Sequence, residues 1–175
     1  MLQPMKKEFI DPISLQDAKE RYLWYVVANS AIIDIENNTC LLMRRGAKEK
    51  EAAGKWAFPG GKFEHEMLAT RENLRLPNAL QILAAKEASE EVGLVIDIES
   101  SEVIANSAFV RADGIPVLCA TIAALFTGGK IVLEEDSVDD YVWASEDDLI
   151  GNRYDCVGSV ATEALKAIAL FRRNS

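Results

Sequence analysis

Three glutamates lie close together near the middle of the chain, within Lys86-Glu87-Ala88-Ser89-Glu90-Glu91-Val92-Gly93. At about 100° per residue, a helix would place Glu87 and Glu91 on one face, with Glu90 beside them. Carboxylates three and four residues apart are neighbours on a helix surface, with about 5–6 Å between Cβ atoms. Carboxylate oxygens are the ligands that Mg²⁺ and Mn²⁺ prefer, so this spacing is compatible with a divalent-cation site.

The same helix has apolar faces that would bury it. One apolar stripe continues the face of the glutamates and is formed by Leu80, Leu83 and Ala84. A second stripe lies beside it and is formed by Ala85, Ala88 and Val92. Carboxylates that extend a buried stripe lose solvation and repel one another, and a bound cation would offset both effects. The alternative is a solvated acidic row, in which like-charge neighbours cost only about 0.2–0.5 kcal/mol. The helix alone leaves both interpretations open.

Two adjacent glycines follow a proline upstream of this helix, in Trp56-Ala57-Phe58-Pro59-Gly60-Gly61. Because a glycine has no Cβ atom, its backbone carbonyl or amide can approach a metal ion or a phosphate closely. A Pro-Gly-Gly sequence is also common in ordinary turns. The glycines therefore become informative only together with the glutamates downstream.

Taken together, Gly60-Gly61-Lys62-Phe63-Glu64 and the segment from Lys86 to Leu94 resemble the Nudix box. The family pattern is a glycine, five residues, Glu, seven residues, then Arg-Glu-aliphatic-x-Glu-Glu-x-Gly-aliphatic. The preceding Trp56-Ala57-Phe58-Pro59 is similar to the segment that usually leads into the box, and the region of Trp143 is similar to the later part of the domain. The resemblance covers residues 22–172.

The resemblance implies an α/β fold, a Nudix-type α/β/α sandwich with a mixed β-sheet. It also implies Mg²⁺- or Mn²⁺-dependent hydrolysis of a pyrophosphate bond in a nucleoside triphosphate, a nucleotide sugar or ADP-ribose. In this sequence Glu90, Glu91 and the Gly60 carbonyl would be the metal ligands. Glu87 would be a further ligand or the base that activates water. The alternative is a non-catalytic, nucleotide-sensing module on the same scaffold.

The sequence departs from the family pattern in the first half of the box. Lys86 takes the place of the family arginine among the catalytic residues, which keeps the charge but loses the planar guanidinium fork. An insertion separates Gly61 from the helix. Counting back from Lys86 puts Asn78 in the place of the first box glutamate. The carboxylates that could supply this group instead are those of Glu64, Glu66 and Glu72.

Charged residues outside the box are candidates for substrate contact. Arg45 ends the second predicted strand, where it could bind a phosphate or face solvent. Glu135 lies with Glu134 and Asp136 in an acidic loop, the region from which Nudix enzymes often recruit a further acid. A solvated acidic loop is the alternative interpretation. Arg45 and Glu135 are the predicted substrate-binding residues.

Strands and helices must hold these groups in place. Turn residues 36–38 between two segments rich in β-branched residues predict a hairpin. Gly93 predicts the end of a helix that begins at Asn78. Helices are expected at 14–22, 78–92 and 157–173, and strands at 23–35, 39–43, 95–98, 103–110, 116–126, 131–133 and 141–143. Because strands and helices do not alternate regularly, a mixed sheet with helices on both sides fits better than a doubly wound parallel sheet.

The composition restricts the partners and the setting. The chain has 175 residues and a formal net charge of −9, with 28 Asp and Glu against 19 Lys and Arg. We therefore expect a single domain, 1–175, with residues 1–21 as an N-terminal extension that could serve a homodimer. The acidity disfavours nucleic-acid polymers and anionic membranes, and the Nudix resemblance implies a small nucleotide as the partner. Three widely spaced cysteines and the lack of a bilayer-length apolar run predict a cytoplasmic protein.

Overall fold

The computed structural model describes residues 25–49, 51–64, 66–69 and 76–173. The helix expected at 14–22 and Glu72 lie outside the described residues. Eight described strands form the sheet, namely β1 (Tyr25–Asp34), β2 (Thr39–Arg45), β3 (Trp56–Ala57), β4 (Gly60–Lys62), β5 (Leu94–Ile96), β6 (Glu102–Val110), β7 (Pro116–Gly129) and β8 (Val138–Ala144). The described helices are α1 (Glu66–Ala69), α2 (Ala79–Val92), α3 (Glu146–Ile150) and α4 (Val160–Arg173).

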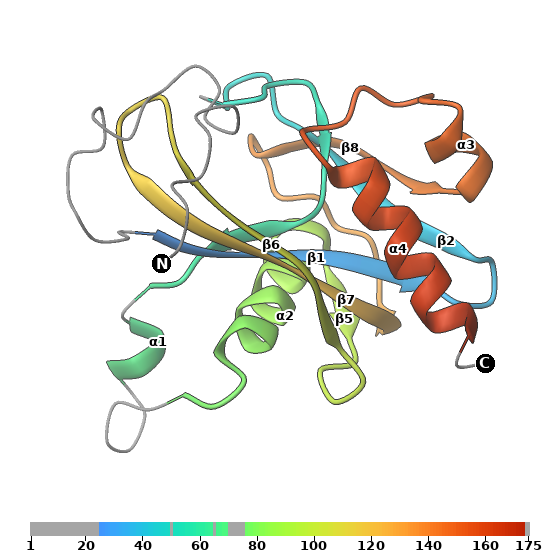
Figure 1. Ribbon diagram of the computed structural model, residues 1–175, viewed down its shortest axis with the longest axis horizontal. Coiled ribbons are helices and arrows are strands. Elements are labelled where there is room, and N and C mark those ends of the chain that lie inside the picture. The colour runs from blue at the N-terminus through green and yellow to red at the C-terminus, as the bar shows by residue number, and fades with distance from the viewer. Residues whose placement is uncertain (1–24, 50, 65, 70–75, 174–175) are drawn as a thin grey trace, which may run out of the picture.

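The sheet is mixed, as the sequence predicts. Strands follow the order β3-β2-β1-β7-β5, with β6 along β7 and β8 along β2 (Figure 1). β1 and β7 run parallel, and the other strand pairs are antiparallel. This central parallel pair joins segments that lie far apart in the sequence, such as Tyr25 and Val117.

β1 and β2 form the predicted hairpin but separate soon after the turn. The Asp34 carboxylate accepts hydrogen bonds from the backbone N–H groups of Glu36 and Asn37, which closes the turn. The two strands pair only at Ile33–Cys40 and Asp34–Thr39. Beyond that point β3 pairs with the edge of β2 that β1 leaves, and β4 takes the place beside β1. β8 runs along the other edge of β2. The divergence lets the Gly60–Gly61 segment enter between the two strands.

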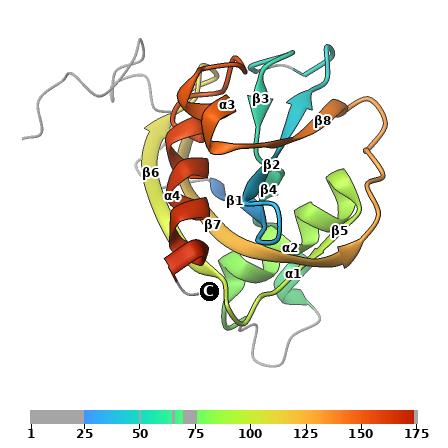
Figure 2. The ribbon, with the colours of Figure 1, turned by 90° about the vertical axis from the view of Figure 1, so that its right-hand side faces the viewer.

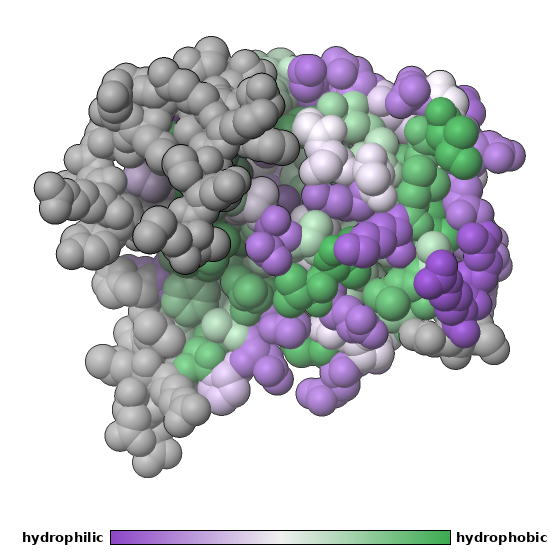
Figure 3. All heavy atoms as spheres, viewed as in Figure 1, coloured by the Kyte–Doolittle hydropathy of each residue, from purple (hydrophilic) through white to green (hydrophobic). Residues whose placement is uncertain are grey.

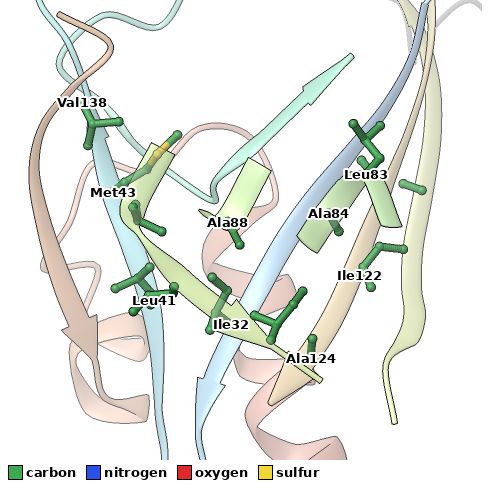
Figure 4. Packing of buried hydrophobic residues seen from close by; sticks show 14 residues of the cluster. Ile32, Leu41, Met43, Leu83, Ala84, Ala88, Ile122, Ala124 and Val138 are labelled. Atoms are coloured by element: carbon green, nitrogen blue, oxygen red, sulfur yellow. The ribbon is translucent and has the colours of Figure 1, made fainter. Parts of the chain in front are cut away.

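Helices cover both faces of the sheet (Figure 2). Alternate residues of β1 point to opposite faces, so Ile32 packs in the cluster with α2 while Ile33 packs in the cluster with α4. Figure 4 shows Ile32 and Ile122 of the sheet in the same cluster as Ala84 and Ala88 of α2. The predicted α/β/α sandwich is confirmed.

α2, which carries the three glutamates, has well-defined ends and a polar anchor. It ends at Gly93, whose left-handed φ of 73° suits glycine, as the sequence predicts. The fully buried Ser30 hydroxyl donates a hydrogen bond to the Ala84 carbonyl at 2.7 Å. This bond joins the middle of α2 to β1 and so fixes the position of the helix against the sheet.

Two predicted boundaries are wrong. Residues 131–133 form no strand, because the Val132 N–H donates to the carbonyl of Val92 at the end of α2 instead of to a neighbouring strand. β7 continues past its predicted end at residue 126, because Gly128 and Gly129 pair with β5. Among the described residues, no helix is long and apolar enough to cross a membrane.

Candidate functional site

The glycine strand β4 lies directly against the acidic end of α2. The backbone N–H of Gly60 donates a hydrogen bond to Glu91 Oε2 at 2.7 Å. A Cβ atom added at Gly61 would lie within 3.0 Å of the Glu87 carboxyl group, closer than real Cβ atoms come. Gly61 therefore makes room for Glu87, while Gly60 supplies the N–H group that holds Glu91. In this arrangement Gly60 contacts Glu91 through its N–H, whereas the sequence assigned its carbonyl to a metal.

The two glutamates beneath the glycines have raised pKa values. Burial raises the pKa of Glu91 to about 8, and the negative charges of Glu87 and Glu134 raise it as well, against the hydrogen bond from Gly60. Burial also raises the pKa of Glu87, which is 9% exposed, although Lys86 partly counteracts this effect. The site thus holds more carboxylate than its described surroundings neutralise, which is the electrostatic condition for binding a cation.

The ammonium group of Lys86 lies between the carboxylates of Glu87 and Glu90. Its Nζ is 3.1 Å from Glu87 Oε1 and 2.6 Å from Glu90 Oε2. The hydrogen bond to Glu90 is the main cause of a pKa of Lys86 above the usual value. Lys86 therefore orients both carboxylates, which is the positioning role that the sequence suggests for it.

The donor groups fit a hard divalent cation in part. In the portion of the chain that the structure describes, no three His, Cys, Asp or Glu side chains gather closely enough to hold a metal ion. Glu87 and Glu91 fit by oxygen-donor type and by their excess negative charge. Glu90 is exposed and held by Lys86, so it would join them only after releasing the ammonium group. The structure thus brings two of the predicted carboxylate ligands together and leaves the third paired.

Among the candidates for the first box glutamate, Glu64 lies in the right place. Asn78 is exposed and caps the start of α2 in a left-handed conformation, with no side-chain hydrogen bond to the helix. Glu66 is exposed on α1. The negative charge of Glu64, in contrast, is close enough to raise the pKa of Glu87. The insertion after Glu64 therefore leaves a carboxylate near the site from the glycine segment itself.

In the acidic loop, Glu134 approaches the site more closely than Glu135 does. The Glu134 N–H donates to the Glu91 carbonyl at 2.9 Å, and the charge of Glu134 contributes to the raised pKa of Glu91. Glu135 is exposed and does not line the adjoining cavity. Asp136 forms an ion pair with Lys48 at 2.5 Å. Glu134 is thus the residue of this loop that contacts α2, and Glu135 stays a predicted substrate contact.

A cavity of about 600 Å³ adjoins the glycines on the face of the sheet opposite α2. Its lining includes Gly60, Gly61, Glu91 and Arg45, together with residues of the central strands. Arg45 donates through Nε to the Glu51 carbonyl at 3.0 Å and through Nη2 to Glu49 at 2.6 Å. Arg45 therefore lies where a substrate could reach it, but it now holds the loop that follows β2.

The floor of this cavity contains polar groups that sequence reasoning missed. Asn29 Nδ2 donates to Cys119 Sγ at 3.3 Å across the parallel β1–β7 pair. Burial raises the pKa of the Cys119 thiol to about 11. Lys62, the residue after the glycines, also lines the cavity. The position of Lys62 directly after two glycines could have indicated its place at the site. No sequence pattern, in contrast, indicates that Asn29 contacts Cys119.

Comparison with known proteins places this geometry in a known fold. No protein-family model and no curated protein matches the chain. A MutT protein from Methanosarcina mazei Go1 matches with a TM-score of 0.61 and 19% identity, over 90% of this chain and 99% of that one. The NUDIX domain of Shewanella oneidensis NrtR, solved with ADP ribose, matches with a TM-score of 0.60 and 16% identity, over 89% of each chain.

A third solved structure contains a metal ion. It is a bifunctional NMN adenylyltransferase/ADP ribose pyrophosphatase from Francisella tularensis, complexed with AMP and a Mn ion. Its TM-score is 0.58 at 16% identity, over 88% of this chain and 43% of that chain. The chain therefore has the fold of Nudix hydrolases, and the fold expected from the box resemblance is confirmed.

Proposed function

We propose that this protein is a cytoplasmic Nudix hydrolase that cleaves a pyrophosphate bond in a small nucleotide with the help of Mg²⁺ or Mn²⁺. The observation that carries the proposal is the contact between the Gly60–Gly61 strand and the paired carboxylates of Glu87 and Glu91. The two halves of the sequence motif are thus in contact in the fold, beside a cavity large enough for a nucleotide.

Each residue of the site has a distinct role in this proposal. Glu87, Glu90 and Glu91 would hold the cation, whose charge would neutralise the pyrophosphate and whose bound water would become more acidic. The Gly60 N–H holds the Glu91 carboxylate in place. Lys86 orients Glu87 and Glu90. Glu87 is the carboxylate proposed to accept a proton from the attacking water.

Substrate contact is assigned to the cavity side of the glycines. Arg45 lines the cavity and is proposed to bind a phosphate after releasing Glu49. Glu135, which is exposed, stays a predicted contact for a substrate that extends over the acidic loop. A nucleoside triphosphate, a nucleotide sugar and ADP-ribose all fit this proposal. ADP ribose is the ligand of the matching Shewanella oneidensis domain, which supports including it in any substrate panel.

The first experiment is a hydrolysis assay over nucleoside triphosphates, nucleotide sugars and ADP-ribose, each with Mg²⁺, with Mn²⁺ and with EDTA. We expect turnover of at least one compound that requires metal. The double variant Glu90→Gln/Glu91→Gln should abolish it, because neutral amides bind hard cations weakly. The matched control, Glu99→Gln/Glu102→Gln, changes two exposed acids outside the cavity and should keep the activity. Unchanged turnover in the first double variant would refute the assignment.

A non-catalytic nucleotide-sensing module is the second candidate function. It is favoured by one observation, namely that Lys86 already pairs with Glu90. Isothermal titration calorimetry with ADP-ribose distinguishes the two functions. Binding without any turnover in excess Mn²⁺ would support the sensing module, whereas metal-dependent turnover supports the hydrolase.

A further inference from the structure

Two cations flank one aromatic ring on the wall of the cavity. Lys62 Nζ lies 4.9 Å from the centroid of the Tyr25 ring, and the guanidinium carbon of Arg111 lies 5.6 Å from it. Both distances are within the range of cation–π attraction. All three side chains line the cavity that begins at Gly60 and Gly61. The ring therefore holds two positive charges close to the candidate site.

The strand register explains how these residues meet. Tyr25 of β1 lies beside Val117 of β7, which in turn lies beside Phe109 of β6, and all three line the cavity. On the other side of β1, Lys62 pairs with Val27. Tyr25 is four residues from the position opposite Gly60, about 13 Å at the usual rise of a strand. Lys62 lies about midway between Tyr25 and the position opposite Gly60, because it pairs with Val27.

The cations that line the cavity differ in how far carboxylates neutralise them. Arg45 and Lys48 have carboxylate partners at 2.6 Å and 2.5 Å. Arg111 has only longer contacts, 3.3 Å to Glu51 and 3.3 Å to Asp113. Within the described residues, Lys62 is within ion-pair distance of no carboxylate. The Lys62 ammonium is therefore the cation most available to an anionic ligand.

We propose that Lys62 and Arg111, positioned by Tyr25, form an anion-binding subsite that takes a phosphate of the substrate on the cavity side of the glycine strand. The inference rests on the proposed function for the identity of the ligand as a nucleotide. These cations then share the cavity with the Glu91 carboxylate of α2. Such a subsite lets a protein of net charge −9 bind an anionic substrate locally.

The subsite predicts specific losses of binding. Dissociation constants for inorganic pyrophosphate and for ADP-ribose would be measured by titration calorimetry, with Mg²⁺ and separately with EDTA. Lys62→Gln should weaken binding about tenfold, because it removes a charge-assisted contact to phosphate. Tyr25→Leu should weaken binding as well, since the ring no longer places the two cations. Tyr25→Phe should restore it, because the ring is the part that matters.

Matched variants separate the subsite from a general charge effect. Lys55→Gln removes an exposed lysine that does not line the cavity, and it should bind both probes like the unchanged protein. Where turnover is measurable, Lys62→Gln should raise KM and leave kcat nearly unchanged. The subsite is refuted if Lys62→Gln binds like Lys55→Gln, or if the unchanged protein binds neither probe. Binding that depends on Lys62 but is followed by no hydrolysis would refute the proposed function alone.

Discussion

Gly61 is the residue at which the site is sterically tightest. A Cβ atom there would press against the Glu87 carboxyl group, so Gly61→Ala must displace either the glutamate or β4. We expect kcat/KM to fall about a hundredfold, the usual effect of misplacing a reacting group by about 1 Å. Gly128→Ala is the matched control, because its Cβ would meet nothing within 4 Å. Equal activity of the two variants, measured with the substrate found in the panel, would contradict this account.

Variants of Lys86 test whether activity depends on the positive charge of this side chain or on its shape. Lys86→Met removes the ammonium that contacts Glu87 and Glu90, and it leaves both carboxylates without this cation. We expect kcat to fall about tenfold or more, as is typical when a residue that orients ligands is lost. Lys86→Arg keeps the charge and should retain most activity. Steady-state kinetics on both variants decide the matter, and full activity of Lys86→Met would show that the contact is dispensable.

The sequence predicted the residues of the helix well and the residues of the loops poorly. Helical spacing alone placed Glu87 and Glu91 on one face, because the period of a helix is fixed. The proximity of Glu64 and Glu134 depends instead on how an insertion and a loop fold back onto α2. A sequence pattern carries no information about those paths, so it could not predict that Glu134 contacts α2.

At the scale of elements, strands with a strong β composition were predicted, but of their pairings only the β1–β2 hairpin was. β1, β2, β6 and the N-terminal part of β7 appear within a few residues of their expected ranges. The parallel pairing of β1 with β7 could not be predicted from the sequence. It joins residues as far apart as Tyr25 and Val117, and no local sequence pattern indicates that they are neighbours. The cavity is built on that pairing. Its lining therefore could not be derived from motifs, although the box residues at its edge could.

The capping box of α3 allows a test of how the stability of the fold depends on pH. Asp148 accepts hydrogen bonds from the Ser145 hydroxyl and N–H, and these bonds and Arg153 lower the pKa of Asp148. A lowered folded-state pKa stabilises the fold above the unfolded value of about 4, and this stability is lost as the pH falls through the folded value.

Asp148→Asn should therefore reduce the free energy of unfolding at about pH 7, and this difference should shrink toward about pH 3. Urea denaturation at several pH values measures it. Asp139→Asn changes an exposed aspartate of β8 and serves as the control. A difference between Asp148→Asn and the unchanged protein that stays constant with pH would show that the charge of Asp148 contributes nothing.

At the scale of the whole molecule, the net charge is negative, whereas the cavity is lined by both cations and carboxylates. The face seen in Figure 3 mixes hydrophilic and hydrophobic side chains. The net charge is −9, while the cations Lys62 and Arg111 line a recessed cavity of about 600 Å³. A small nucleotide can enter such a cavity, but a duplex brings many phosphates to the outer surface, where the excess carboxylates repel it.

We therefore expect no binding of duplex DNA or of structured RNA, even at low ionic strength, where electrostatic attraction to a basic protein would be strongest. Fluorescence anisotropy of a labelled duplex, titrated with the protein at low and at high salt, measures this. ADP-ribose at the same protein concentrations is the positive comparison. Salt-sensitive binding of the duplex would mean that a basic surface outside the cavity dominates the field, and that the acidity of the chain does not select small nucleotides over polymers.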